Sequence, residues 1–189
     1  MERILVTLFI LLASLSSLAQ TTAKFDKFKN RTHFMTAQTP TGKVTFGEEN
    51  ASALMRKMNM GVGFSCEGQV DDCTPASIEL LFVASTTDWS FQGHHDVNLL
   101  IDGKPLTAGK SDHDGTVNSG SDLTEYVDTN ITPEVLIAMA KAKTAVEVQI
   151  GQFEFPLTDK NLLALRDIGT HLSVVKAEIA AGKAKMSGQ

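Results

Sequence analysis

The chain has 189 residues, 42% of them hydrophobic, and a formal net charge of −5 at pH 7. Because this balance is only mildly acidic, it argues against binding to nucleic acid and against binding to an anionic membrane surface. The length suits one domain, which can bury a hydrophobic core without a structural metal or multiple disulfides.

Residues 4–15 form an almost uninterrupted apolar run near the N-terminus. A membrane-spanning helix needs about 20 apolar residues, so this run favours a cleavable secretion signal over an anchor. Ser17 and Ala19 suit the small-residue positions of a signal-peptidase site, which places the cut before Gln20. We therefore expect a mature chain with no membrane span, in the periplasm or secreted. The chain then divides into a signal peptide over 1–19, a single β-rich domain over 20–182 and a frayed C-terminal tail over 183–189.

The mature chain begins with a predicted loose leader at 20–23 and continues as a series of predicted strands. The clearest strand is at 58–66, where apolar side chains alternate with small or polar ones. Gly61 and Gly63 on its polar face suggest that another segment packs closely there or that the strand bends. The strand at 77–85 is its expected neighbour. Further strands are predicted at 28–35, 43–46, 89–91, 97–101, 106–108, 123–131, 144–150 and 153–157.

The chain has two cysteines, Cys66 and Cys73, separated by six residues. In an oxidising compartment such a pair favours a disulfide, and Gly68 with two aspartates between them favours a turn. A zinc site of the CxxC type needs a tighter spacing and a second pair. We predict a disulfide that holds a strand end, with two free thiols or half of a metal site as the alternatives.

The second half of the chain carries clear turn and helix signals. The dipeptide at 102–103, Asp-Gly, predicts a hairpin, and the polar residues 110–122 predict a loop. Thr132, followed by proline, suits a helix start, and Thr158 caps a last helix whose apolar positions continue to Val175. Because the strands run in series with one helix between them, we expect a mainly β fold. The predicted architecture is an antiparallel β-sandwich or barrel of about eight strands with two helices in the C-terminal half.

Four stretches contain turns, core positions and a helix cap in a characteristic order. They are FDKFKNRTHF at 25–34, GVGFSCEG at 61–68, LLIDGKPL at 99–106 and VEVQIGQFEFPLTDKNLLALRDI at 146–168. Together they resemble a loosely defined set of uncharacterised secreted bacterial β-rich proteins. The resemblance covers most of the mature chain and implies an all-β core and a bacterial exported setting. It carries no activity and no site residue.

Two histidine–carboxylate clusters flank the predicted Asp-Gly hairpin. If the chain folds back at that turn, His94 lies about opposite Asp112 and the clusters meet at the open hairpin end. Imidazole and carboxylate groups suit Zn²⁺ or Cu²⁺. The predicted metal ligands are His94, His95, Asp112 and His113. The structural alternative places His95 at the edge of the core and assigns the aspartates to a turn.

Three other patterns carry less information. Residues 112–115 resemble part of a calcium loop but lack the flanking helices and the distal glutamate of an EF-hand. Met55, Met58 and Met60, with Met35 and His33, could form a copper site, although methionine as core filler is simpler. There is no G-x-S-x-G motif. Catalytic triads assemble from distant positions, so the sequence leaves an enzyme open.

These observations favour an exported, non-enzymatic binding or interaction module of unknown ligand. Its sheet would present a surface or an exposed edge strand to a protein or another component of the cell envelope. Two alternatives stay open: a periplasmic metal-binding protein that uses the His/Asp cluster, and an unrecognised hydrolase. No cofactor is expected apart from Zn²⁺ or Cu²⁺ at that cluster.

Overall fold

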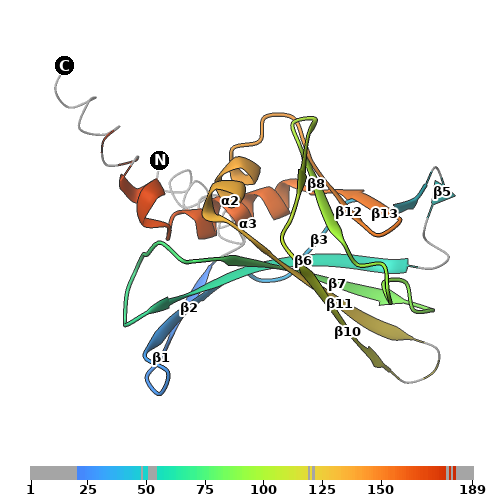
Figure 1. Cartoon of the computed structure of the whole chain (residues 1–189), viewed down its shortest axis with the longest axis horizontal. Coiled ribbons are helices and arrows are strands. Elements are labelled where there is room, and N and C mark those ends of the chain that lie inside the picture. Colours follow the sequence, from blue (N-terminus) through green and yellow to red (C-terminus); the bar gives the residue numbers. More distant parts are fainter. Residues whose placement is uncertain are drawn as a thin grey trace, which may run out of the picture.

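The structure is a computed structural model that describes residues 21–47, 49–50, 55–118, 120, 122–177, 179 and 181. The predicted signal peptide over 1–19 and the predicted tail over 183–189 lie outside the described residues. The described chain forms two antiparallel sheets and helices in the C-terminal half, which confirms the predicted mainly β fold. The helices and the smaller sheet lie on one side of the larger sheet (Figure 1).

The larger sheet has seven strands in the order β1-β2-β6-β7-β11-β10, with β3 also paired to β6. Its paired strands are all antiparallel, and the order has two ends, so this sheet does not close into a barrel. Its strands are β1 (Thr22–Asp26), β2 (Arg31–Met35), β3 (Thr39–Pro40), β6 (Met55–Glu67), β7 (Ile78–Thr86), β10 (Ser111–Val117) and β11 (Leu123–Ile131).

The smaller sheet has six strands in the order β5-β4-β13-β12-β8-β9. Its strands are β4 (Thr45–Phe46), β5 (Glu49–Asn50), β8 (Val97–Ile101), β9 (Lys104–Thr107), β12 (Val146–Ile150) and β13 (Phe153–Pro156). The helices α2 (Pro133–Ala140) and α3 (Asp159–Gly169) pack against each other. No helix among the described residues has the length and apolarity needed to cross a membrane.

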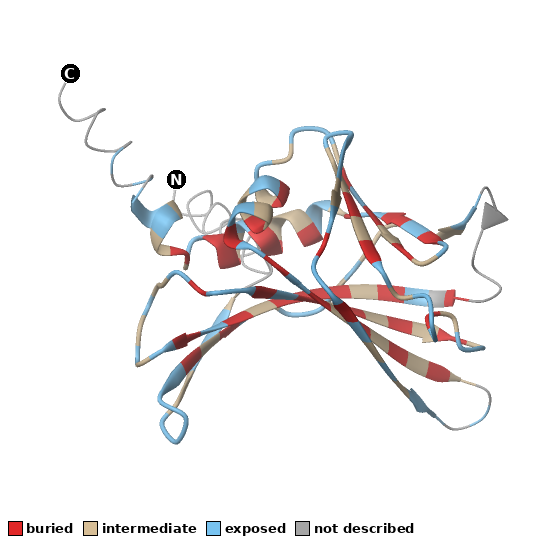
Figure 2. Ribbon diagram, viewed as in Figure 1, coloured by how far each residue is buried: buried red, intermediate tan, exposed pale blue. Residues whose placement is uncertain are grey.

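One face of the larger sheet makes the core. The alternation predicted at 58–66 is confirmed, since every second residue from Met58 to Cys66 is buried. Figure 2 shows the same alternation of buried and more exposed positions along β6, β7 and β11. The two sheets meet directly, because the rings of Phe82 and Phe155 touch edge to face with centroids 5.8 Å apart. Burying each large apolar side chain contributes roughly 1.5–3 kcal/mol to folding.

Several local predictions are confirmed. The Asp-Gly turn joins β8 to β9 with Ile101 opposite Lys104, and β7 pairs with β6. The last helix begins with a capping box, in which the Thr158 backbone N–H donates to Asn161 and the Asn161 backbone N–H donates to the Thr158 hydroxyl. Cys66 and Cys73 form the predicted disulfide, with their Cα atoms 6.3 Å apart.

Two segments predicted to lack strands form them. The leader prediction is wrong from residue 22 onward, because β1 pairs with β2 and the Thr21 backbone N–H donates to Asp167 at 2.6 Å. The polar segment 110–122 was predicted to be a loop, yet residues 111–117 form the edge strand β10. Polar side chains are ordinary on an edge strand, so composition alone misreads it.

Two other predictions are wrong: the strand at 89–91 and the continuation of the last helix to Val175. Residues 89–91 form no strand, because the backbone N–H groups of Ser90 and Phe91 donate to the Glu125 carboxylate. The last helix ends at Gly169, and a separate helical stretch begins at residue 173. The backbone between them bonds to Cys73, whose N–H donates to His171 and whose carbonyl accepts from Ser173.

Candidate functional site

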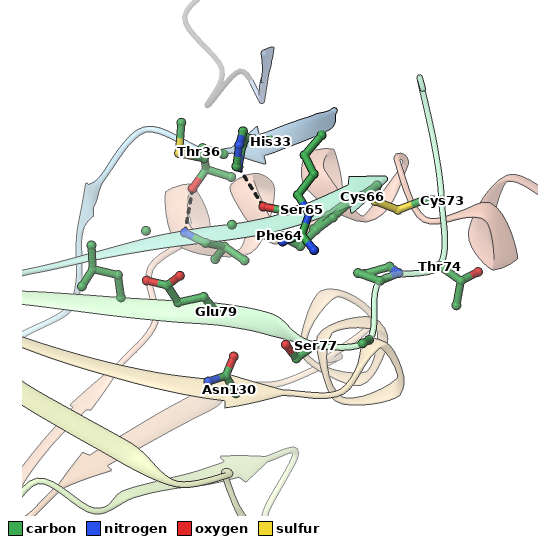
Figure 3. Close-up of a pocket in the computed structure, with 18 of the residues that line it drawn as sticks. His33, Thr36, Phe64, Ser65, Cys66, Cys73, Thr74, Ser77, Glu79 and Asn130 are labelled. Atoms are coloured by element: carbon green, nitrogen blue, oxygen red, sulfur yellow. Dashed lines mark hydrogen bonds between the residues drawn. A yellow bond between two sulfur atoms is a disulfide. The ribbon is translucent and has the colours of Figure 1, made fainter. Parts of the chain in front are cut away.

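A groove of about 860 Å³ lies on the face of the larger sheet that points away from the core. Its residues come from β2, β6 and β7, from the segment that follows Cys73 and from the end of β11 (Figure 3). Residues 61–67 of β6 line it, and among them the side chains of the core positions are buried whereas Ser65 and Glu67 are exposed. Exposed side chains on this strand are therefore available to a ligand on the face opposite to the core.

The floor of the groove is flat because β6 has glycines there. A Cβ atom on Gly63 would lie 3.3 Å from the carbonyl oxygen of Phe34, and one on Gly61 would lie 3.3 Å from the Gln38 side chain. The segment that follows β2 continues beside this strand, because the Thr36 backbone N–H donates to the Val62 carbonyl and β3 pairs with β6. The close approach suggested by the sequence is found at Gly61, where the Gln38 side chain lies.

The Cys66–Cys73 disulfide and the segment that follows Cys73 line one side of the groove (Figure 3). Hydrogen bonds hold the loop between the two cysteines on both of its sides. The Thr32 hydroxyl donates to the carbonyl of Gly68 at 2.7 Å and accepts from the Val70 N–H at 3.2 Å, which ties the loop to β2. On its other side, Asp72 pairs with Lys176 and accepts from the Ser173 hydroxyl. Hydrogen bonds from the Lys176 ammonium and, to a smaller extent, from the Ser173 hydroxyl lower the pKa of the Asp72 carboxyl. The loop between the cysteines, which borders the groove through the disulfide, is thus anchored at both ends.

The groove offers charges of both signs and hydrogen-bonding groups. Arg31 on β2 lies opposite Glu67 on β6, and Glu79 on β7 lies opposite Gly63. The Ser65 hydroxyl and the Nδ1 atom of His33 are 2.8 Å apart across β2 and β6. Figure 3 shows this contact at the groove surface. These groups can orient a ligand that carries both donors and acceptors.

The predicted metal cluster is brought together only in part. The rings of His95 and His113 stack with centroids 5.8 Å apart. His94 and Asp112 are exposed, and Asp112 lies on the opposite face of β10, opposite Asp128 and 3.4 Å from the Lys110 ammonium. Within the part of the chain that the structure describes, no group of three or more His, Cys, Asp and Glu side chains is arranged to hold a metal ion.

The expected fold-back fails because the hairpin is short. Its ladder ends at Asn98 opposite Thr107, and the Gly109 backbone N–H then donates to Asn130 of the larger sheet. The chain thus leaves one sheet for the other before residue 112. His95 and His113 meet through packing between the sheets rather than across the predicted ladder.

Glu125 is a buried carboxylate that was not among the candidate residues predicted from the sequence. It is fully buried and accepts hydrogen bonds from the Thr86 hydroxyl and from the backbone N–H groups of Ser90 and Phe91, at 2.9 to 3.1 Å. Its Oε1 atom is also 3.0 Å from the Nε2 atom of His113. The carboxylate therefore holds the segment after β7 against the sheet. The sequence signal for its burial was its position between Leu123 and Val127, in the alternating pattern of core-facing residues on a strand.

Comparison of the chain with protein-family models, curated proteins and solved structures finds no match. The resemblance to secreted bacterial β-rich proteins therefore stays a prediction. Any function for this chain has to be argued from the geometry of its own residues.

Proposed function

We propose that the mature chain is an exported, non-enzymatic binding module and that its ligand lies in the groove of the larger sheet. The observation that carries this proposal is the groove itself, which has glycines on β6 and is bordered by a disulfide whose loop is held by hydrogen bonds on both sides. A preformed concave site loses little conformational entropy when a ligand binds. A disulfide also suits a compartment outside the cytoplasm, in the periplasm or beyond the cell.

The ligand best suited to this groove is an extended peptide segment of a protein partner. A peptide presents a donor and an acceptor at each residue, which the hydroxyl of Ser65 and the amide of Asn130 can meet. Its charged side chains can pair with Arg31 on one side and with Glu79 on the other. Specificity would then come from the order of charges along the peptide.

The experiment is selection of a random-sequence peptide library on the mature protein, followed by affinity measurement with labelled peptides. Replacing Ser65 by Trp fills the groove, and we expect binding to weaken by at least about tenfold, or 1.4 kcal/mol. Thr107→Trp on the exposed edge strand β9 is the matched control and should leave affinity unchanged. The proposal is wrong if the selected peptides share no pattern, or if they bind Ser65→Trp as tightly as the natural protein.

Export is tested separately. Expression of the full chain in a bacterial host should yield a periplasmic product whose N-terminal residue is Gln20. A cytoplasmic product that retains residues 1–19 would contradict the secretion proposal. It would leave the groove experiment valid, because that experiment uses the purified domain.

A second candidate function is metal binding, and the stacked rings of His95 and His113 favour it. The two imidazoles offer nitrogen donors that Zn²⁺ and Cu²⁺ accept. Titration calorimetry with each metal should give binding that His95→Ala with His113→Ala abolishes. His94→Ala is the control, because its exposed side chain lies outside the stacked pair. Equal weak binding by all the variants would exclude the site.

A further inference from the structure

The hairpin between β1 and β2 ends in an exposed aromatic side chain. Phe28, at the turn, is 90% exposed. Figure 1 shows the hairpin at one edge of the larger sheet, and Figure 2 shows that its end is exposed. A single exposed apolar side chain is common on protein surfaces, so Phe28 becomes informative only together with the groups around it.

The turn that presents Phe28 is well ordered by its own hydrogen bonds. The Asp26 carboxylate accepts from the backbone N–H groups of Phe28 at 2.9 Å and of Lys29 at 3.2 Å. Asn30 has a φ of 48°, a left-handed conformation that asparagine tolerates. Because the turn is already fixed, placing the ring against a partner costs little further ordering.

The base of the hairpin is also held. All five residues of β1 pair with β2, from Thr22 opposite Met35 to Asp26 opposite Arg31. The carbonyl of Asn30 accepts from the Gly68 N–H at 2.7 Å, which links the turn to the disulfide loop. The hairpin is therefore a firm support for its tip rather than a loose arm.

Charge around the tip differs from that of the whole chain. Between residues 24 and 31 there are four cationic side chains and one carboxylate, a net of +3, whereas the full chain carries −5. The cationic side chains are all exposed, and they are Lys24, Lys27, Lys29 and Arg31. The carboxylate of Asp26 is occupied by the turn N–H groups, which lower its pKa and keep it ionised. The Lys27 ammonium lies 5.0 Å from the centre of the Phe28 ring.

We propose that this tip docks on an anionic phospholipid surface, with Phe28 in the interface between headgroups and acyl chains and Lys27 and Lys29 against the phosphates. An exposed apolar ring surrounded by ammonium groups has the chemistry of peripheral membrane contacts. This site is separate from the groove function, since it needs neither the groove nor its ligand.

A lipid surface fits the tip better than a protein partner does. A stable protein interface buries about 800 Å² on each side, and one aromatic ring on a narrow turn offers far less. A bilayer can accept a single ring. The acidic remainder of the chain weakens this contact little, because charges further away than about 8–10 Å are largely screened at physiological salt. Net charge averages over the whole chain and therefore does not describe the local cationic charge of this tip.

Sedimentation of the mature protein with vesicles tests the proposal. We expect binding to vesicles of phosphatidylglycerol and phosphatidylethanolamine, with less binding at high salt and little binding to phosphatidylcholine alone. Reversing both charges with Lys27→Glu and Lys29→Glu should reduce the partition coefficient by more than about tenfold. Phe28→Ser should reduce it severalfold, and a Phe28→Trp variant should show blue-shifted emission on anionic vesicles.

Matched controls separate the tip from general effects of charge and apolarity. Val117→Ser removes another exposed apolar side chain, which is 64% exposed, and should leave vesicle binding unchanged. Lys43→Glu with Lys104→Glu reverses two exposed lysines elsewhere and should reduce binding much less than the tip pair does. The proposal is overturned if the protein does not bind anionic vesicles, or if controls and tip variants lose binding equally. Tip-dependent binding to soluble polyglutamate without binding to vesicles would point to an acidic polymer instead and would also overturn it.

Discussion

Glu125 and Glu79 lie on the paired strands β11 and β7 but on opposite faces of the larger sheet. Glu125 faces the core, is fully buried and accepts hydrogen bonds from four protein groups. Glu79 is exposed and lines the groove. A carboxylate that protein donors have saturated has little capacity left for a ligand. The comparison teaches that the polar residues with a structural role and those available for binding are separated by face rather than by residue type.

The histidines repeat this contrast. His113 contacts Glu125 under Trp89, whose ring meets the imidazole edge to face at 6.1 Å. The Nδ1 atom of His33 is 2.8 Å from the Ser65 hydroxyl at the groove surface. If the contrast is correct, changes on the core-facing side should alter stability, and changes in the groove should alter binding with little effect on stability.

The strongest test replaces the two glutamates. Glu125→Ala leaves a buried hydroxyl, two backbone N–H groups and an imidazole without their acceptor, so we expect a loss of about 3–5 kcal/mol in the free energy of unfolding. Glu79→Ala on the exposed face should change it by less than about 0.5 kcal/mol. Urea denaturation of both variants measures the difference. Similar losses in the two variants would show that the faces do not divide the roles.

The Cys66–Cys73 disulfide borders the groove, yet we expect it to contribute to the stability of the fold. Cys66→Ala with Cys73→Ala should lower the free energy of unfolding by about 2–3 kcal/mol, because a short closed loop restricts the unfolded chain only modestly. The same urea experiment on the natural protein with reductant should give a similar loss. Reductant should have no effect on the double variant. A loss well above that of Glu125→Ala would mean that the disulfide beside the groove, and not the buried carboxylate, dominates stability.

The glycines of the two faces should also behave differently. A Cβ atom on Gly115 would lie 2.3 Å from the Trp89 ring, so Gly115→Ala should displace the ring and cost about 1–3 kcal/mol. Tryptophan emission should shift to longer wavelength as the ring becomes more hydrated. Gly61→Ala meets only the flexible Gln38 side chain at 3.3 Å and should cost less. Equal costs, or unchanged emission in Gly115→Ala, would argue against close packing under Trp89.

Asp102 differs from both glutamates, because its carboxylate is exposed to solvent and yet accepts several hydrogen bonds from the protein. The backbone N–H groups of Lys143 and then Thr144 hold the pKa of this carboxyl well below its ordinary value of 3.8. A lowered folded-state pKa gives stability that is present above the unfolded pKa and is lost as pH falls towards the folded pKa. Asp102→Asn should therefore be less stable than the natural protein at pH 7, with the difference shrinking below about pH 4. Urea midpoints across this range measure it, and a constant difference would contradict the assignment.

Much of the fold is readable from local patterns. The alternation at 58–66 and the boundaries of β11 follow from period-two burial, and the hairpin at Asp102 follows from an Asp-Gly turn. The edge strand β10 was missed because its side chains are polar on both faces, so burial leaves no alternation in the sequence. The break after Gly169 was missed because the backbone there bonds to Cys73, nearly a hundred residues earlier in the chain.

The candidate site was harder to predict than the fold. The two cysteines could be paired from composition and compartment, and the glycines of β6 marked a strand face that neighbouring residues approach closely. Neither pattern predicted a groove. The groove is lined by β2, β6, β7 and the segment after Cys73, which the strand order of the sheet and the disulfide bring together.

The sequence by itself determined the local features of this protein: the period of its strands, its turns, its helix starts and its disulfide. Each of these depends on residues close together in the chain, or on the chemistry of a single residue type. Only the tertiary structure decided that His95 meets His113, that Glu125 is saturated and that the β1–β2 hairpin presents Phe28 to solvent. Those outcomes depend on which sheet the chain joins after Gly109 and on which strand lies at each edge. Such choices come from packing between distant segments, which no short pattern encodes.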